Sequence, residues 1–178
     1  CPLASTAAAT VSPAKPVNCA TCHDKAVKEY AATVHGVARK GGNAVAATCT
    51  DCHGTHDIRA KDDPQSRVHR ARVPETCGSC HDAIRAQFTG GQHGKLRQQG
   101  MTGAPGCNDC HSAHDIQRHD LPRFQLEAIT QCGNCHQDFI ATYRDTFHGK
   151  VTNLGYTQVA TCAACHGATP GHGEAGSA

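Results

Sequence analysis

Cysteine and histidine are the residues of this chain whose number and spacing could do chemistry. The 178 residues include 13 Cys and 14 His, but only 4 Phe, 3 Tyr, 1 Met and no Trp. A high cysteine content in a small chain is typical of disulfides, structural zinc or a thioether-linked cofactor, and the spacing distinguishes among these. Large apolar side chains are scarce, so we expect something other than protein to fill part of the interior.

Twelve of the 13 cysteines lie in one repeated pattern, C-x-x-C-H, which occurs six times. The six copies are Cys19/Cys22/His23, Cys49/Cys52/His53, Cys77/Cys80/His81, Cys107/Cys110/His111, Cys132/Cys135/His136 and Cys162/Cys165/His166. C-x-x-C-H is the attachment signature of c-type haem. The two thiols add to the porphyrin vinyl groups, and the adjacent histidine becomes the proximal ligand of the iron. The sequence therefore predicts six covalently bound haem c groups.

Three other uses of paired cysteines fit the pattern less well. A zinc ribbon needs four ligands for each metal and gives no reason for a histidine directly after every second cysteine. A disulfide scaffold would not need that histidine either. A thioredoxin-like redox motif would occur once, beside a βαβ pattern, and the chain shows none.

The six motifs form three pairs with identical internal spacing. In each pair, 30 residues separate the first cysteine of one motif from the first cysteine of the next: Cys19 to Cys49, Cys77 to Cys107, and Cys132 to Cys162. The repeat unit is thus a two-haem module. We expect an N-terminal low-complexity segment at 1–16, followed by dihaem modules at 17–75, 76–130 and 131–178.

Six further histidines are candidates for the distal ligands of six irons. Three stand 12 residues after a first-motif histidine and precede a glycine: His35, His93 and His148. His56 and His114 come three residues after a proximal histidine, and His172 comes six residues after one. His69 and His119 have no counterparts in the other modules, and we interpret them as surface or propionate-contacting residues. Met101 is interpreted as packing, so no Met/His iron is expected.

Which distal histidine serves which iron is a separate question. A residue three positions after a proximal histidine is too close in sequence to reach the opposite face of the same haem. We hypothesise that His56 and His114 ligate the first haem of their own module, while His35 and His93 ligate the second.

The elements that must position these residues read as short helices. Apolar residues near helical spacing follow His23, His81 and His136, and an aromatic ring stands seven residues after each of these histidines, at Tyr30, Phe88 and Tyr143. These rings could lie against porphyrin or pack one helix on another. The glycine after each second histidine suits a left-handed C-cap that ends the helix. No stretch alternates as a strand does, so we expect a mainly α fold with much irregular structure and little or no sheet.

With its paired motifs and the intervening H-G, the segment 17–172 resembles the multihaem c-type cytochromes. These include periplasmic pentahaem and outer-membrane decahaem electron-transfer proteins, and extracellular cytochromes that form conductive filaments. The resemblance implies bis-histidine ligation, closely spaced haems and a role in electron transfer. Bis-histidine ligation closes both axial positions, which favours electron transfer over substrate binding. Two alternatives stay open, a subunit of a polymeric filament and a multihaem reductase with one open iron.

Location and partners follow from the resemblance and from the first residue. Haem c attachment implies a site outside the bacterial inner membrane: periplasmic, attached to the outer membrane or extracellular. Cys1 stands outside the motifs, and a chain that begins with cysteine looks like a cleaved lipoprotein, so we expect lipidation there. No apolar run is long enough to span a bilayer. We expect redox proteins or copies of the chain as partners and no nucleic acid, since no basic and aromatic stripe is present.

Overall fold

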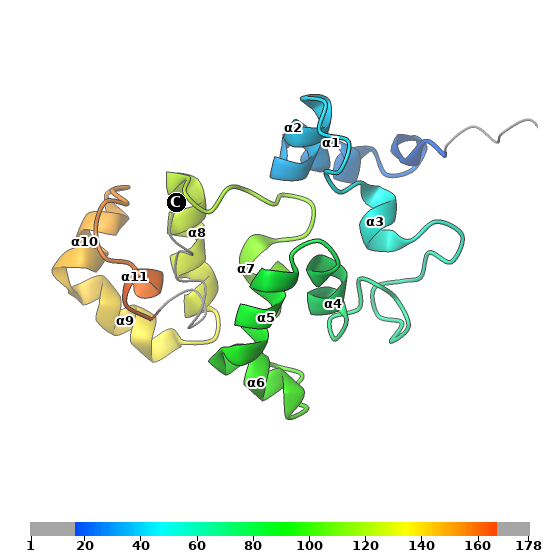
Figure 1. Ribbon diagram of the computed structural model, residues 1–178. Helices are drawn as coiled ribbons and strands as arrows, with labels where there is room; N and C mark the ends of the chain where they lie inside the picture. The colour runs from blue at the N-terminus through cyan, green and yellow to red at the C-terminus, as the bar shows by residue number, and fades with distance from the viewer. Residues whose placement is uncertain (1–16, 167–178) are drawn as a thin grey trace, which may run out of the picture.

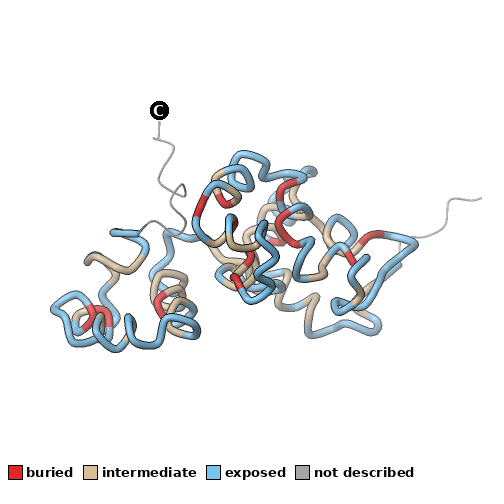
Figure 2. Tube along the Cα trace, turned by 90° about the horizontal axis from the view of Figure 1, so that it is seen from below, coloured by how far each residue is buried: buried red, intermediate tan, exposed pale blue. Residues whose placement is uncertain are grey.

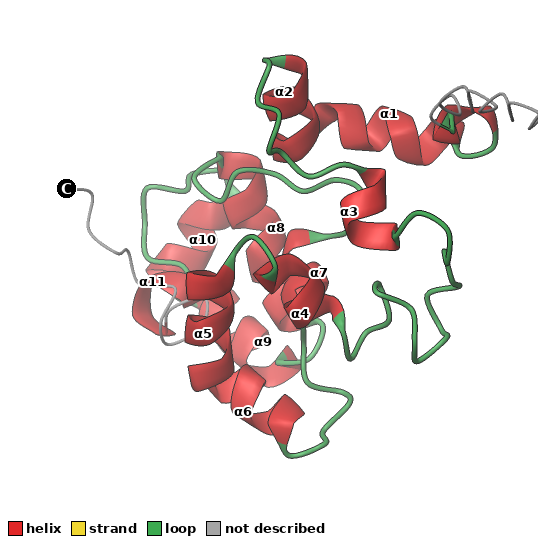
Figure 3. Ribbon diagram, turned by 45° about the vertical axis from the view of Figure 1, so that its right-hand side comes forward, coloured by secondary structure: helices red, strands yellow, loops and turns green. Residues whose placement is uncertain are grey.

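The computed structural model describes residues 17–166, so Cys1, His172 and the N-terminal segment 1–16 lie outside the described residues. The described residues form eleven α-helices and one 3-10 helix, and they contain no strand (Figure 3). This confirms the expected fold class, mainly helical with long irregular connections. No helix among residues 17–166 is both long enough and apolar enough to cross a membrane.

The first module sets the pattern that the others repeat. A 3-10 turn, η1 (Cys19–Thr21), carries the first motif and leads into α1 (Asp24–Ala32) and α2 (Val34–Lys40). A loop then leads to α3 (Cys49–His53), which is the second motif itself. Residue Asn18 caps η1, because its side chain accepts a hydrogen bond from the backbone N–H of residue 20.

The second and third modules have helices of similar lengths in the same order. Module two contains α4 (Val73–Gly78), α5 (Asp82–Gly90), α6 (Gln92–Gln98) and α7 (Cys107–His111). Module three contains α8 (Pro122–Gly133), α9 (Gln137–Asp145), α10 (Phe147–Asn153) and α11 (Cys162–His166). The expected helices after the first-motif histidines are confirmed. The domain limits stay a prediction, and those at 75/76 and 130/131 fall inside α4 and α8.

One extended residue joins the two helices that follow each first motif. In module one this residue is Thr33, with φ −73° and ψ 166°, and its hydroxyl accepts a hydrogen bond from the N–H of Gly36 at 3.1 Å. Thr146 repeats this cap on Gly149 in module three. The chain therefore turns sharply at one residue, and the H-G histidine lies in the first turn of the second helix.

The glycine after each H-G histidine does not end a helix, and the expected left-handed C-cap is wrong. Gly36, Gly94 and Gly149 lie inside α2, α6 and α10, and none is among the described residues with positive φ. A Cβ at Gly36 would stand 2.1 Å from the carbonyl oxygen of Tyr30, and the same 2.1 Å separation recurs in the other modules. The glycine is required because the two helices meet too closely for a side chain.

The apolar core is small. Among the described residues, the buried apolar side chains are Val73, Phe88, Ala104 and Ile129. Buried positions occur in short separated stretches along the tube (Figure 2). Large apolar side chains such as Phe139 and Leu154 are 75% and 77% exposed. A chain of this size normally buries far more of its apolar surface, which agrees with the expectation that a non-protein group fills part of the interior.

The modules follow one another across the molecule. In Figure 1, α1 and α2 lie at the upper right, α4 to α7 in the centre and α9 to α11 at the left. The first and last modules therefore lie on opposite sides of the molecule.

Candidate haem-binding site

The two motifs of each module are held in different local structures. The first-motif histidines, His23, His81 and His136, each stand at the N-cap of the following helix. The second motif occupies a five-residue helix in which its two cysteines, three residues apart, lie on one side. Gly54 and Ser112 directly follow α3 and α7 and have positive φ values of 86° and 59°. The left-handed residue that ends a helix therefore follows the second motif of the module.

The second motifs of modules one and two begin at an acid cap. The Asp51 carboxylate accepts hydrogen bonds from the backbone N–H and the hydroxyl of Thr48, at 2.7 and 2.6 Å. These bonds lower the pKa of Asp51 below its usual value. Asp109 likewise accepts from the N–H of Gly106 at 2.6 Å. Neither carboxylate was among the predicted site residues, although their position two residues after each first cysteine is a recognisable N3 signal.

Within each module, the first cysteines of the two motifs lie near each other. Burial, followed by the nearby thiol of Cys19, raises the pKa of Cys49, and the nearby thiol of Cys107 is the main cause that raises the pKa of Cys77. In module three, burial and then the nearby thiol of Cys162 raise the pKa of Cys132. The 30-residue spacing seen in the sequence thus places two attachment points side by side three times.

Between modules, the last cysteine of one module lies near the first motif of the next. Cys80 is close enough to Cys52 to raise its pKa, although burial of Cys52 is the larger cause. Burial raises the pKa of Cys110 to about 11, with a further contribution from Cys132 and a smaller one from Cys135. The attachment points from Cys19 to Cys162 therefore form an unbroken series in chain order.

The side chains of two predicted thioether residues, Cys22 and Cys165, are exposed. Their role in holding haem stays a prediction from the C-x-x-C-H motif.

Three pairs of histidine rings face each other across module boundaries. The ring centres of His35 and His81 are 6.2 Å apart, and the planes are inclined by 34°. His93 and His136 are also 6.2 Å apart, at 32°. His53 and His114 are 5.9 Å apart, at 26°. Each pair joins one candidate distal histidine to one proximal histidine.

These separations fit two imidazoles that ligate one iron from opposite sides. Since a metal–imidazole bond is about 2 Å long, the centres of two such rings stand roughly 6 Å apart. Burial, followed by the nearby partner ring, lowers the pKa of His35, and the same two causes lower the pKa of His93. A lowered pKa favours the neutral imidazole, which is the form that binds a metal. The residues present therefore fit haem iron.

The expected assignment of distal ligands within modules is wrong for the pairs that the structure describes. His35 faces the first-motif histidine of module two, and His93 faces that of module three. His114 faces His53 of module one instead of the first motif of its own module. The reason is tertiary: the H-G histidine begins a helix that points out of its module and towards the neighbour.

The other histidines differ in their surroundings. His56 and His148 are exposed, and among residues 17–166 neither ring faces another histidine. His172 lies outside the described residues, so its role stays a prediction. The ring of His69 accepts a hydrogen bond from the N–H of Ala71 at 3.3 Å, while His119 is exposed. The ring of His111 is 5.1 Å from that of Phe124 on α8.

The aromatic residue seven positions after each first-motif histidine anchors the loop to the second motif. The hydroxyl of Tyr30 donates to the carbonyl of Ala47 at 2.7 Å, and that of Tyr143 donates to the carbonyl of Ala160 at 3.1 Å. Each acceptor lies two residues before the first cysteine of the second motif. Phe88 has no hydroxyl and is buried instead. These contacts agree with the interpretation that the rings pack the protein together, and they show that the two tyrosines also hold the loop before the second motif.

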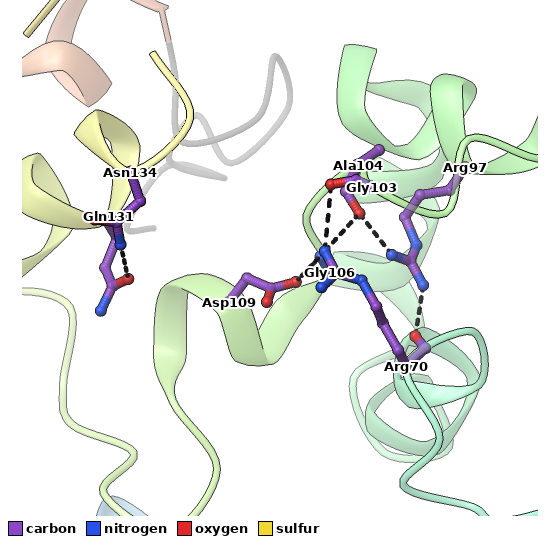
Figure 4. A network of polar contacts seen from close by, with 8 residues as sticks. All are labelled: Arg70, Arg97, Gly103, Ala104, Gly106, Asp109, Gln131 and Asn134. Atoms are coloured by element: carbon purple, nitrogen blue, oxygen red, sulfur yellow. Dashed lines mark hydrogen bonds and ion pairs between the residues drawn. The ribbon is translucent and has the colours of Figure 1, made fainter. Parts of the chain in front are cut away.

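Two arginines hold the second motif of module two. Arg97 donates to the carbonyls of Ala104 and Arg70, at 2.7 and 2.5 Å, and Arg70 forms an ion pair with Asp109 at 3.2 Å (Figure 4). This network ties the start of α7 to α6 and to the loop before α4. No sequence signal marked Arg70 or Arg97, because their partners are mainly backbone carbonyls.

The alternative uses of the cysteines agree less well with this arrangement. None of the twelve motif cysteines is paired in a disulfide. Zinc would need four converging ligands. In the part of the chain that the structure covers, no three Cys, His, Asp or Glu side chains gather in that way.

Comparison with known protein families gives a match over part of the chain. Residues 35–86 match the family described as the doubled CXXCH motif. The match indicates a multihaem c-type cytochrome. It supports covalent haem at the C-x-x-C-H motifs and a haem-based role in electron transfer. No curated protein and no solved structure matches the chain significantly.

The matched segment covers the second and third motifs, so it crosses the boundary between our first two modules. It begins at His35 and includes His81, the two rings that face each other at 6.2 Å.

Proposed function

We propose that this protein transfers electrons through six bis-histidine c-type haems at the bacterial cell envelope. The observation that carries the proposal is the unbroken series of attachment points. Thiol contacts within modules, such as Cys19 with Cys49, alternate with approaches between modules, such as Cys52 with Cys80. Haem supplies reversible one-electron chemistry when it is bound, and the protein sets its potential through ligands and burial. This chain would hold the haems close together and in the order of their motifs along the sequence.

Ligation by two histidines supports a carrier over an enzyme. A reductase needs an iron with a vacant or labile sixth site. Three proximal histidines, His53, His81 and His136, each already face a second histidine. The remaining candidates are sufficient in number for the remaining irons, so the protein needs no open site.

The experiment is a haem count combined with a redox titration of the native holoprotein. We expect an intact mass that fits the chain with six haems, and reversible uptake of six electrons. Electron paramagnetic resonance of the oxidised native protein should show low-spin iron throughout. A smaller haem number, or a high-spin iron together with turnover of nitrite or hydroxylamine, would overturn the proposal.

Attachment to the membrane is a separate part of the proposal. Lipid on the thiol and amine of Cys1 would hold the protein at the envelope and place its partners, redox proteins or copies of itself, at a surface. Mass measurement of the N-terminal peptide tests this. A peptide with a free Cys1 thiol would contradict lipidation and leave electron transfer unaffected.

A further inference from the structure

The segment that follows the second motif of module two contacts both of the other modules. Its first residue, Ser112, has a positive φ of 59°, so the chain turns back directly after α7. In Figure 1, the connection from α7 bends towards the side of α3 before it returns to α8. That course brings His114 to the ring of His53, with 5.9 Å between the ring centres. The segment 112–117 therefore holds a candidate ligand opposite a proximal histidine of module one.

Packing alone does not hold His114 in that place. His114 is exposed, whereas the three residues that follow it are half-buried. The carbonyl of Ile116 accepts a hydrogen bond from the N–H of Val34 at 3.0 Å, which ties the segment to the start of α2. The position of the His114 ring therefore depends on the contacts made by Asp115 and Ile116.

The second restraint on this segment is an ion pair between Asp115 and α8. The Arg123 guanidinium donates from Nη2 to the Asp115 carboxylate at 2.8 Å and from Nε to the Glu127 carboxylate at 2.7 Å. Glu127 stands four residues after Arg123 on the same helix, so it holds the guanidinium in one orientation. The amide of Gln117 donates to the same Asp115 oxygen at 3.2 Å. The Asp115 carboxylate is thus fixed between its own segment and module three.

The next residue of α8 contacts a second proximal histidine. The ring of Phe124 lies 5.1 Å from that of His111, and the two planes are inclined by 18°, so the rings are stacked. Stacking at such a separation is favourable for two aromatic rings. A ring stacked in this way opposes rotation of the imidazole about its bond to a metal. Adjacent residues on a helix point about 100° apart, so Arg123 and Phe124 reach different partners.

We propose that the first turn of α8 positions axial histidines of two haems in the other two modules. Arg123 acts through Asp115 and keeps the distal His114 in place. Phe124 fixes the plane of the proximal His111. This inference rests on the proposed haem function, and it adds residues that hold the ligands. The two haems are called haem 2, predicted at Cys49 and Cys52, and haem 4, predicted at Cys107 and Cys110.

The effect of Arg123 is expected at the ligand, with little change in the stability of the whole protein. The Arg123 and Asp115 side chains are 63% and 40% exposed. An exposed ion pair contributes little to overall stability, since water and salt screen both charges. Loss of the pair releases one side of the segment that carries His114. The histidine should then leave the iron more readily.

The first experiment measures how readily the distal ligand of haem 2 is displaced. Cyanide can bind a bis-histidine iron only after one histidine has left, and stopped-flow mixing of the oxidised holoprotein with cyanide follows this step. Arg123→Met keeps an unbranched side chain and removes its charge. We expect cyanide to bind haem 2 about threefold faster, or more, than in the wild type. Assigned paramagnetic NMR spectra show which haem has reacted.

A matched control and a double variant separate the ion pair from general loosening. Arg118→Met removes a similar exposed ion pair, with Asp120 at 2.6 Å, from the same connection. It should leave cyanide binding at the wild-type rate. Asp115→Asn should reproduce the effect of Arg123→Met, and the double variant should be no faster than either single variant. Equal rates in Arg123→Met and Arg118→Met would overturn the role of Arg123.

The second experiment tests the stacked ring. Phe124→Leu keeps an apolar side chain and removes the ring, so the His111 imidazole should turn. The low-spin ferric signals of haem 4 should then shift in electron paramagnetic resonance and NMR spectra, whereas Phe124→Tyr should keep the native signals. Phe124→Met, a longer apolar side chain without a ring, repeats the test. Unchanged haem 4 signals in these two ringless variants would overturn the role of Phe124.

An internal reference distinguishes this effect from unfolding of α8. The haem predicted at Cys132 and Cys135 begins at the other end of that helix, and its signals should stay unchanged in every variant. All variants keep the motif cysteines and the candidate axial histidines, so each should still take up six electrons reversibly. Absent effects with six-electron uptake intact would overturn this inference alone. A native protein with fewer haems would overturn the proposed function instead.

Discussion

The imidazole of His35 lies opposite that of His81, with ring centres 6.2 Å apart, although the two residues belong to different modules. This pair places a histidine of module one beside the first motif of module two. The equivalent pair, His93 with His136, joins the second module to the third. Haem ligation by both histidines of such a pair would tie each module to the next and would supplement the small protein core with ligand bonds.

Close helix packing at the H-G glycines predicts a stability difference between two neighbouring positions. Gly94→Ala would place a Cβ 2.1 Å from the carbonyl of Phe88, whereas Gly90→Ala meets nothing within 4 Å. We expect Gly94→Ala to lower the free energy of unfolding by about 1–3 kcal/mol through strain. Gly90→Ala should leave it unchanged or slightly raised. Denaturant unfolding of the two holoproteins checks this, and equal stabilities would contradict the packing argument.

The tyrosine hydroxyl that anchors the loop gives a second prediction. Tyr143→Phe removes the hydrogen bond to the carbonyl of Ala160 while it keeps the ring, so we expect a loss of about 1 kcal/mol. Tyr156 is 64% exposed, and Tyr156→Phe is the matched control, expected to have no effect. Thermal unfolding measures both. A Tyr143→Phe protein as stable as the control variant would show that the hydroxyl does not anchor the loop.

The capping carboxylate predicts a dependence on pH. Hydrogen bonds from Thr48 lower the pKa of Asp51, so its stabilising contribution is present above the unfolded value of about 3.9 and is lost as the pH falls further. Asp51→Ala should therefore melt below the wild type at pH 6, and the two melting temperatures should converge below about pH 4. Asp62→Ala, at an exposed position, is the control. A difference in melting temperature that persists below pH 4 would exclude ionisation of Asp51 as its cause.

Much of this architecture could be predicted from local spacing. The C-x-x-C-H motifs, the 30-residue repeat and the helices after His23, His81 and His136 all follow from residues close together in the sequence. Identical spacing within each module made the three repeats visible, because each repeat is one local structural unit.

The ligand pairing could not be predicted in the same way. Spacing within a module places His35 at the start of a helix, but the direction of that helix depends on how the chain turns at Thr33. The role of Gly36 was hidden for the same reason, since its close contact is with the carbonyl of Tyr30 on the preceding helix. Arg97 binds backbone carbonyls, which no side-chain pattern reveals.

The central claim is that each H-G histidine ligates an iron in the following module. Replacement of one such ligand should change the reduction potential of a haem in the following module. In His35→Met, the haem attached at Cys77 and Cys80 should become a Met/His site with a raised potential. The haem attached at Cys49 and Cys52 should keep its two histidines. Assigned paramagnetic NMR spectra of the variant distinguish these haems.

The most direct test is a cryo-electron microscopy map of the native holoprotein that resolves the axial ligands. We predict His35 as the distal ligand of the haem attached at Cys77 and Cys80, opposite His81. We also predict His93 opposite His136, and His114 opposite His53. A map in which His35 binds the iron on His53, or in which every module supplies both ligands of its own haems, would contradict this account.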